Sequence, residues 1–431
     1  LWRIRCRETL LTATTQEEQD AVWQKVLNEN IFVLCQTEMA KKITERVLRG
    51  YRNIPTHCAV YPNLVETLSL SDTPKNKSKK DSLIKKLLST KFWKLNNGQL
   101  TMKFNAVVSN PPYQVKDGGA GASASPTYHH FVKLAKELNT PIISMIMPAK
   151  WYSDGKGLET FRASMLKDRH IAKLYDFVDS RTCFENVDVA GGICFFLRDS
   201  NYEGDCQFTC LNNGVTTTTK RNLADNDTLI RFNDAVSIIQ KVTKASKAFY
   251  STKVSARKPF GLATNVTPIS EGDLILRYNK GVGKYSSSMI TKGVELIPKW
   301  KGIISRLTAE HAGQSDKKGQ KKVLSSLGML KPYEICTETY LVADAFDTGQ
   351  EATFLYKYLS TCLVRFLVSL LASTQQMTRE KFAYVPLQNF TSASDIDWSK
   401  SVSDIDRQLY NKYQLTDAER QFIEQQIKPM E

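Results

Sequence analysis

The stretch Phe104-Asn105-Ala106-Val107-Val108-Ser109, followed at once by Asn110-Pro111-Pro112-Tyr113, decides the fold class of this chain. Its first part is a short apolar run that is typical of a buried strand, and two prolines end it abruptly. Because a residue that precedes proline is held in an extended conformation, the loop is stiff where the strand ends. Open α/β sheets place their ligand crevices at that edge. The amide of Asn110, the backbone carbonyls and the ring of Tyr113 suit a planar ring that carries an exocyclic amine.

Helical and strand patterns alternate around this stretch. Helices are expected over residues 15–29, 38–48, 127–138 and 161–166, and strands over 31–34, 104–108, 142–147, 171–178 and 191–197. Residues 72–81 are expected to form a polar, basic surface loop whose lysines either face solvent or contact phosphate. The alternation predicts an α/β fold with a doubly wound sheet.

Length and charge bound the function. A chain of 431 residues is long enough for two domains. Its 59 lysines and arginines against 44 acids give a formal charge of +15, which favours a polyanionic partner such as a nucleic-acid backbone.

Cysteine and histidine usage indicates neither a metal site nor a disulfide framework. The nine cysteines contain no CxxC pair, the five histidines show no ligand spacing, and Cys206 and Cys210 are expected as reduced strand residues. This usage, with no signal peptide, predicts a reducing cytoplasm. The most apolar stretch, Phe354–Leu371, is interrupted by Lys357 and Arg365, so a packed helix is expected there and no membrane span.

Asn110-Pro111-Pro112-Tyr113 resembles the NPPY motif of the amino-methyltransferases, above all the DNA N6-adenine methyltransferases. Farther along, Pro148–Arg162 and Phe184–Leu197 resemble the Eco57I-type restriction-modification methylases, in which a GKGL…FR helix precedes an F…V-x-x-GG-x-C-x-F hairpin. The likeness covers residues 100–200. It implies a class I methyltransferase-like, Rossmann-like catalytic domain over residues 1–205 and an α+β target-recognition domain with C-terminal helices over residues 206–431.

The resemblance implies a site-specific DNA adenine-N6 methyltransferase of a type II restriction-modification system. Methyl would pass from S-adenosylmethionine to an adenine flipped out of the duplex. Asn110, Pro111, Pro112 and Tyr113 would be catalytic, with the Asn110 side chain and the Pro112 carbonyl gripping the amino group, so that positioning carries the step. Tyr113 and Phe184 would sandwich the base, although Phe184 has a core aromatic as its plain alternative. The implied partners are double-stranded DNA and a cognate restriction endonuclease, with no membrane.

The cofactor site departs from the family pattern. Methyltransferases hold S-adenosylmethionine with a glycine-rich turn, whereas only Gly50 and Gly98 precede the motif, and Asn105 stands where an aspartate is common. Glu38 is the candidate ligand for the ribose hydroxyls. Two explanations stay open: the glycine-rich strand lies upstream of Leu1, as the missing Met and the early helix suggest, or the chain is a degenerate paralogue that binds DNA without methylating it.

The region after residue 205 is basic and carries no further catalytic signature. The residues expected to contact DNA there are Lys299, Lys301, Arg306, Lys317, Lys318, Lys321 and Lys322. Each of them alone is more often a solvated charge, but together, in the position where methylases of this type carry a target-recognition domain, they favour DNA.

Two rival functions remain. One is methylation of a glutamine amide or of an RNA base amine, because the NPPY motif serves planar amides too. The other is a non-catalytic DNA-binding specificity module on a methylase scaffold. Replacing Asn110 by alanine separates them, because only an enzyme has turnover to lose.

Overall fold

The computed structural model describes residues 13, 15–50, 52–95, 101–115, 125–153, 157–189, 191–212, 214–309, 316, 319–372 and 375–430. The chain divides into two compact units, which are residues 1–147 with 197–202 and residues 148–196 with 203–431. This division differs from the boundary at residue 205 expected from the sequence. That boundary separates two expected functions, catalysis and target recognition, and it stays a prediction. Within the described ranges, none of the helices combines the length and the hydropathy that a membrane span needs.

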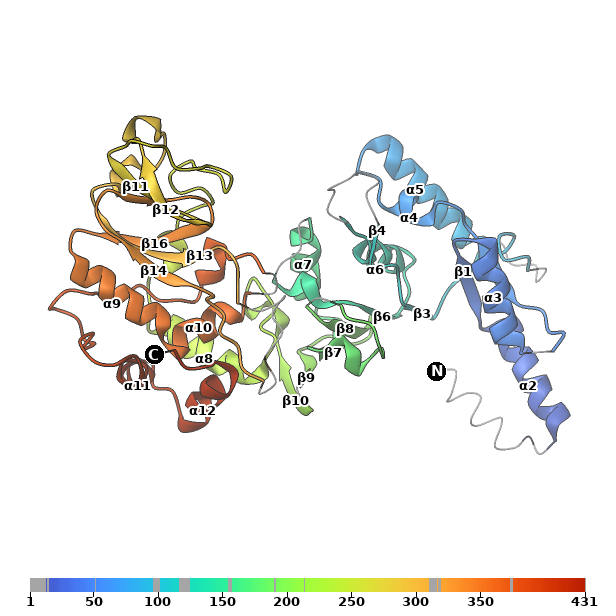
Figure 1. Ribbon diagram of the computed structural model, residues 1–431. Helices are drawn as coiled ribbons and strands as arrows, with labels where there is room; N and C mark the ends of the chain where they lie inside the picture. The colour runs from blue at the N-terminus through green and yellow to red at the C-terminus, as the bar shows by residue number, and fades with distance from the viewer. Residues whose placement is uncertain are drawn as a thin grey trace. The chain divides into compact units, whose positions relative to one another are not determined.

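The first unit alternates helices and short strands, as the sequence pattern predicts (Figure 1). Threonines cap two of its helices: the side chains of Thr15 and Thr37 each accept a hydrogen bond from the first turn that follows. The elements are α2 (Gln16–Glu29), β1 (Phe32–Cys35), α3 (Glu38–Arg49), β2 (His57–Val60), α4 (Leu64–Leu68), α5 (Pro74–Leu87), β3 (Ala106–Ser109), β4 (Gln114–Val115), β5 (Ser125–Pro126), α6 (Tyr128–Glu137) and β6 (Ile142–Pro148).

Helix α5 corrects one prediction, because residues 72–81 are not a loop. Thr73 accepts a hydrogen bond from the Asn76 N–H at 3.3 Å, and Pro74 occupies the first turn, where its missing N–H costs nothing. Leu83 and Leu87 are buried at 1% and 3% exposure in a cluster with Leu64, Leu68, Trp93 and Leu134. The sequence does not show this apolar side clearly, because lysines outnumber the apolar residues in the helix.

The sheets confirm the α/β fold class. β1 and β2 pair in parallel, and β3 and β6 pair in parallel from Ala106 opposite Ile142 to Ser109 opposite Met145. A six-stranded sheet has the order β10-β9-β7-β8-β6-β3, with β3 at its edge. Parallel neighbours that are not consecutive in the chain require crossover connections, which is the hallmark of wound α/β sheets.

The second unit contains both an α/β part and a larger C-terminal part. Its first elements are α7 (Glu159–Leu166), β7 (Ile171–Phe177), the start of β8 (Ile193–Asp199, whose last three residues belong to the first unit), β9 (Cys206–Asn212), β10 (Val215–Arg221) and α8 (Asn233–Lys244). Two three-stranded sheets follow, β12-β11-β15 and β14-β13-β16, from β11 (Leu274–Tyr278), β12 (Gly281–Tyr285), β13 (Trp300–Ser305), β14 (Leu327–Leu330), β15 (Glu334–Cys336) and β16 (Tyr340–Phe346). Cys206 and Cys210 are buried strand residues, as predicted.

The apolar stretch near residue 360 is two packed helices rather than one. α9 (Gly349–Ser360) lies beside β13 and β14 (Figure 1), and α10 (Cys362–Ser369), α11 (Val402–Lys412) and α12 (Asp417–Gln426) complete a large buried cluster with α8. Arg365, fully buried in α10, donates to the carbonyls of Ser360, Lys322 and Lys428. Its charge therefore satisfies backbone groups that the core would otherwise leave unpaired.

Candidate functional site

The Asn-Pro-Pro-Tyr loop leaves the carboxyl end of β3 at the edge of the sheet. Asn110 and Pro112 are exposed, Pro111 is buried, and Tyr113 is half-buried. Within the described part of the chain, no hydrogen bond engages the Asn110 side chain. An amide that is fixed by stiff flanking backbone and open to solvent is ready to bind a planar polar group.

Thr127 fastens this loop from the other side. Its hydroxyl donates to the Pro112 carbonyl at 2.5 Å, and its backbone N–H donates to the Tyr113 carbonyl at 3.1 Å. Thr127 is 3% exposed and precedes α6, yet its side chain does not cap that helix. The hydroxyl therefore bonds to the loop and does not cap the helix, so hydrogen bonds from Thr127 link the start of α6 to the motif loop.

Two short strands continue the brace beyond Tyr113. Gln114 pairs with Pro126 and Val115 with Ser125 in antiparallel register, as β4 and β5. This role of Thr127 could not be predicted from the sequence, because a threonine before a helix ordinarily indicates an N-cap.

Phe184 lies in the second unit, on a turn held together by Ser180. The Phe184 N–H donates to the Ser180 carbonyl at 2.9 Å. The Ser180 hydroxyl donates to the Val187 carbonyl at 2.9 Å and accepts from the Val189 N–H at 2.8 Å. Phe184 is half-buried, so it is no fully buried core aromatic. Its pairing with Tyr113 around a base stays a prediction.

In the second unit, residues of the two segments that resemble the Eco57I-type pattern contact one another. The buried Trp151 indole donates to the Cys194 sulfur at 3.4 Å, and Arg162 donates to the Trp151 carbonyl at 2.7 Å. The Phe161 ring meets Trp151 edge-on at 5.8 Å. The segments that resemble the Eco57I-type pattern therefore form a scaffold, and the structure gives these residues packing roles.

Gly192 sits at the tightest point of that scaffold. Its φ is +79°, and a Cβ there would lie 2.3 Å from the Phe177 carbonyl oxygen and 2.5 Å from the Arg231 guanidinium. Arg231 in turn donates two hydrogen bonds, at 2.6 and 2.8 Å, to the fully buried carboxylate of Asp176. Only glycine fits between this ion pair and the backbone.

Glu38 is exposed in the first turn of α3, directly after β1. An acidic side chain just beyond the carboxyl end of a parallel strand fits a ribose-hydroxyl ligand. Of the two glycines that precede the motif, Gly50 ends α3 at a φ of +61°, and Gly98 lies outside the described residues. The described residues thus offer S-adenosylmethionine a carboxylate but no close-approach glycine turn.

The structure contradicts one of the predicted DNA-contacting cations. The prediction is wrong for Lys301, which is fully buried and donates to the carbonyls of Leu296, Ile297, Lys299 and Lys331 at 2.8–3.2 Å. Burial lowers the pKa of Lys301 to about 8. This ammonium satisfies backbone carbonyls and cannot reach a phosphate.

The other cations remain candidates. Lys299 pairs with Asp347, and Arg306 lies 3.7 Å from Glu338. The Lys322 ammonium donates to the Ser325 carbonyl, while that of Lys321 lies 6.0 Å from the centre of the Phe232 ring. Lys317 and Lys318 lie outside the described residues.

Two comparisons with known proteins match parts of this chain. Residues 29–184 match the family model described as Eco57I restriction-modification methylase. A protein of Mycoplasma pneumoniae named "Uncharacterized adenine-specific methylase" is 34% identical over 116 residues, which are 26% of this chain and 27% of that protein.

Solved structures are similar at lower identity. The type IIG restriction endonuclease BpuSI is 12% identical with a TM-score of 0.33, covering 94% of this chain and 64% of that one. The type IIL restriction-modification enzyme MmeI, solved in complex with DNA, is 10% identical with a TM-score of 0.46, covering 90% and 62%. The matched part is about a quarter of the curated relative and under two thirds of these two chains.

Proposed function

We propose that this chain, whose residues 29–184 match the Eco57I restriction-modification methylase family, is a site-specific DNA adenine-N6 methyltransferase. The observation that carries the proposal is the exposed Asn110 amide on a loop that two prolines stiffen and Thr127 fastens. The match to an adenine-specific methylase supports adenine as the target. S-adenosylmethionine is the proposed methyl donor, double-stranded DNA the partner, and a restriction endonuclease the companion activity.

Asn110 and the proline carbonyls would grip the amino group of a flipped adenine. The Asn110 side-chain oxygen accepts one amino proton. The Pro112 carbonyl accepts the second through the lone pair that Thr127 leaves, since a carbonyl oxygen has two. Among the described residues the Pro111 carbonyl has no hydrogen-bond partner, so it is the alternative second acceptor.

This grip would make the amine nucleophilic without a strong base. Two acceptors draw the nitrogen lone pair out of conjugation with the ring and aim it, so that orientation and fixed dipoles lower the barrier. Tyr113 and Phe184 would stack on the two faces of the base, which offsets the few kcal/mol of unstacking. S-adenosylmethionine supplies an electrophilic methyl group when bound, and Glu38 would hold its ribose hydroxyls.

The test is transfer of radiolabelled methyl from S-adenosylmethionine to unmethylated DNA, with Asn110→Ala and the matched control Asn53→Ala. Asn53 is an exposed asparagine of the same unit, in the segment between α3 and β2. Label recovered as N6-methyladenine, lost with Asn110→Ala and kept with Asn53→Ala, supports the proposal. A protein that binds DNA but transfers nothing would overturn it and leave a recognition module.

A further inference from the structure

Helix α5 carries an unusual density of positive charge for a helix that also packs on a core. It holds six lysines, at positions 75, 77, 79, 80, 85 and 86, and one acid, Asp81. Its buried side comprises Leu83 and Leu87, with Ile84 partly buried. The residues on the opposite side are therefore presented to solvent by a fixed support.

Two of the six lysines are neutralised or covered by neighbours. The Lys80 ammonium pairs with Asp72 at 3.0 Å, and that of Lys86 lies 5.2 and 5.3 Å from the ring centres of Tyr61 and Phe92. The other four, Lys75, Lys77, Lys79 and Lys85, are exposed and form no ion pair within the described residues. Their charge is available to a partner.

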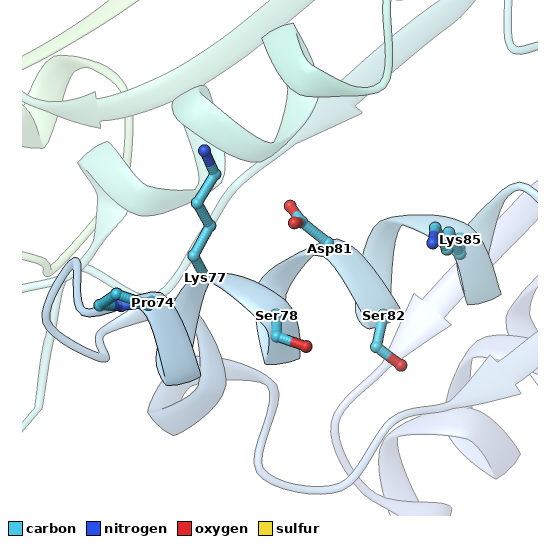
Figure 2. A pocket seen from close by; sticks show the side chains of 6 residues that line it. All are labelled: Pro74, Lys77, Ser78, Asp81, Ser82 and Lys85. Atoms are coloured by element: carbon cyan, nitrogen blue, oxygen red, sulfur yellow. The ribbon is translucent and has the colours of Figure 1, made fainter.

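The exposed side of α5 is also hollowed. A hollow of about 410 Å³ is lined by Pro74, Lys77, Ser78, Asp81, Ser82 and Lys85. Figure 2 shows these side chains along the helix, with Lys77 and Asp81 on one side and Ser78 and Ser82 on the other. The Lys77 and Lys85 ammonium groups and the Ser78 and Ser82 hydroxyls can donate hydrogen bonds to the oxygens of phosphate esters, whereas the Asp81 carboxylate repels them.

The dimensions fit a polymer better than a single phosphate. Lys77 and Lys85 are eight residues apart, which is about 12 Å along a helix axis. A DNA strand carries one charge per about 3.4 Å of duplex axis, so the two lysines span several phosphates. We infer that the exposed side of α5 is a docking surface for the backbone of duplex DNA, additional to the target-recognition region.

The first unit thereby joins a backbone contact to the proposed base-gripping loop. α5 packs against α4, and α6 contributes Leu134 to the same apolar cluster. α6 begins next to Thr127, which holds the Asn-Pro-Pro-Tyr loop. The inference rests on the proposed function in one respect, which is that the polyanion is DNA.

The test is a DNA-binding titration of the full chain by fluorescence anisotropy, with two duplexes of unrelated sequence over about 50 to 200 mM salt. The test variant is Lys77→Ala/Lys85→Ala. The matched control is Lys25→Ala/Lys42→Ala, which removes the same charge from exposed positions on α2 and α3.

The test variant is expected to flatten the slope of log affinity against log salt by about 1 for each lysine, equally for both duplexes. The control keeps the wild-type slope. Asp81→Asn, which removes a repulsive charge, is expected to tighten binding and steepen the slope.

A wild-type slope in the test variant, or equal flattening in the control, would overturn the docking surface. Methyl transfer at saturating DNA separates this inference from the proposed function. If transfer occurs while the test variant binds as wild type, the surface fails and the enzyme stands. If nothing is transferred while the test variant alone loses affinity, the surface stands and the enzyme fails.

Discussion

Thr127→Val is the sharpest test of how the motif loop is held. Valine keeps the shape of threonine but removes the hydroxyl that donates to the Pro112 carbonyl at 2.5 Å. The net loss of one hydrogen bond is about 1 kcal/mol, and water can replace the donor because Pro112 is exposed. The free energy of unfolding should therefore fall by about 1 kcal/mol.

Catalysis should suffer more than stability does. If the loop relaxes, the acceptor carbonyls are no longer oriented toward the amino group. A loss of about 1–2 kcal/mol of transition-state stabilisation then lowers kcat about 5- to 30-fold. DNA affinity should stay within about twofold of wild type, because the phosphate contacts are unchanged. Thr127→Ser keeps the hydroxyl and should restore most of kcat.

The assay is steady-state methyl transfer at saturating DNA and S-adenosylmethionine, well below the melting temperature, beside denaturant unfolding of the same samples. A serine variant as slow as the valine variant would refute the hydrogen-bond argument. So would a kcat that declines only in proportion to the folded fraction, since that outcome belongs to a purely structural residue.

Two further predictions concern the second unit. Gly192→Ala should lower the free energy of unfolding by about 3 kcal/mol or more, because the new Cβ would lie 2.3 Å from the Phe177 carbonyl oxygen. Gly191→Ala should lower it less, because its Cβ would meet only a lysine methylene at 3.3 Å. Comparable denaturation midpoints for the two variants would contradict this prediction. The hydrogen bond from Arg257 lowers the pKa of Glu338 to about 2, so its stabilisation is present above about pH 4.5 and is lost as the pH falls toward 2. Glu338→Gln should flatten acid unfolding over that range, and an unchanged pH profile would count against the pairing.

The sequence predicted the elements whose signals are local. An apolar run closed by two prolines located β3, although its bounds are Ala106–Ser109 and not 104–108. Thr416, just before α12, and Glu419, in its first turn, form a capping box, and their spacing of three residues can be read directly from the sequence. Both signals depend on residues within a few positions of one another, so no tertiary information was needed.

Other features depend on distant partners and could not be predicted in this way. Lys301 looks like a surface cation beside Trp300, but its burial depends on carbonyls that belong partly to a different loop, at Lys331. Thr127 reaches back across 15 positions to Pro112. Helix α5 could have been found: Thr73-Pro74 is a helix-start signal that the lysines outweighed.

The burial of Lys301 makes it a built-in reporter of structural integrity. An amine-reactive probe read by mass spectrometry should modify exposed lysines such as Lys77 and Lys85 at once. Lys301 should stay silent while β13 is intact, because its ammonium is enclosed by four carbonyl oxygens. The delay before modified Lys301 appears in the spectrum therefore measures how often this sheet opens. The same experiment in the presence of DNA records which lysines the duplex protects from modification.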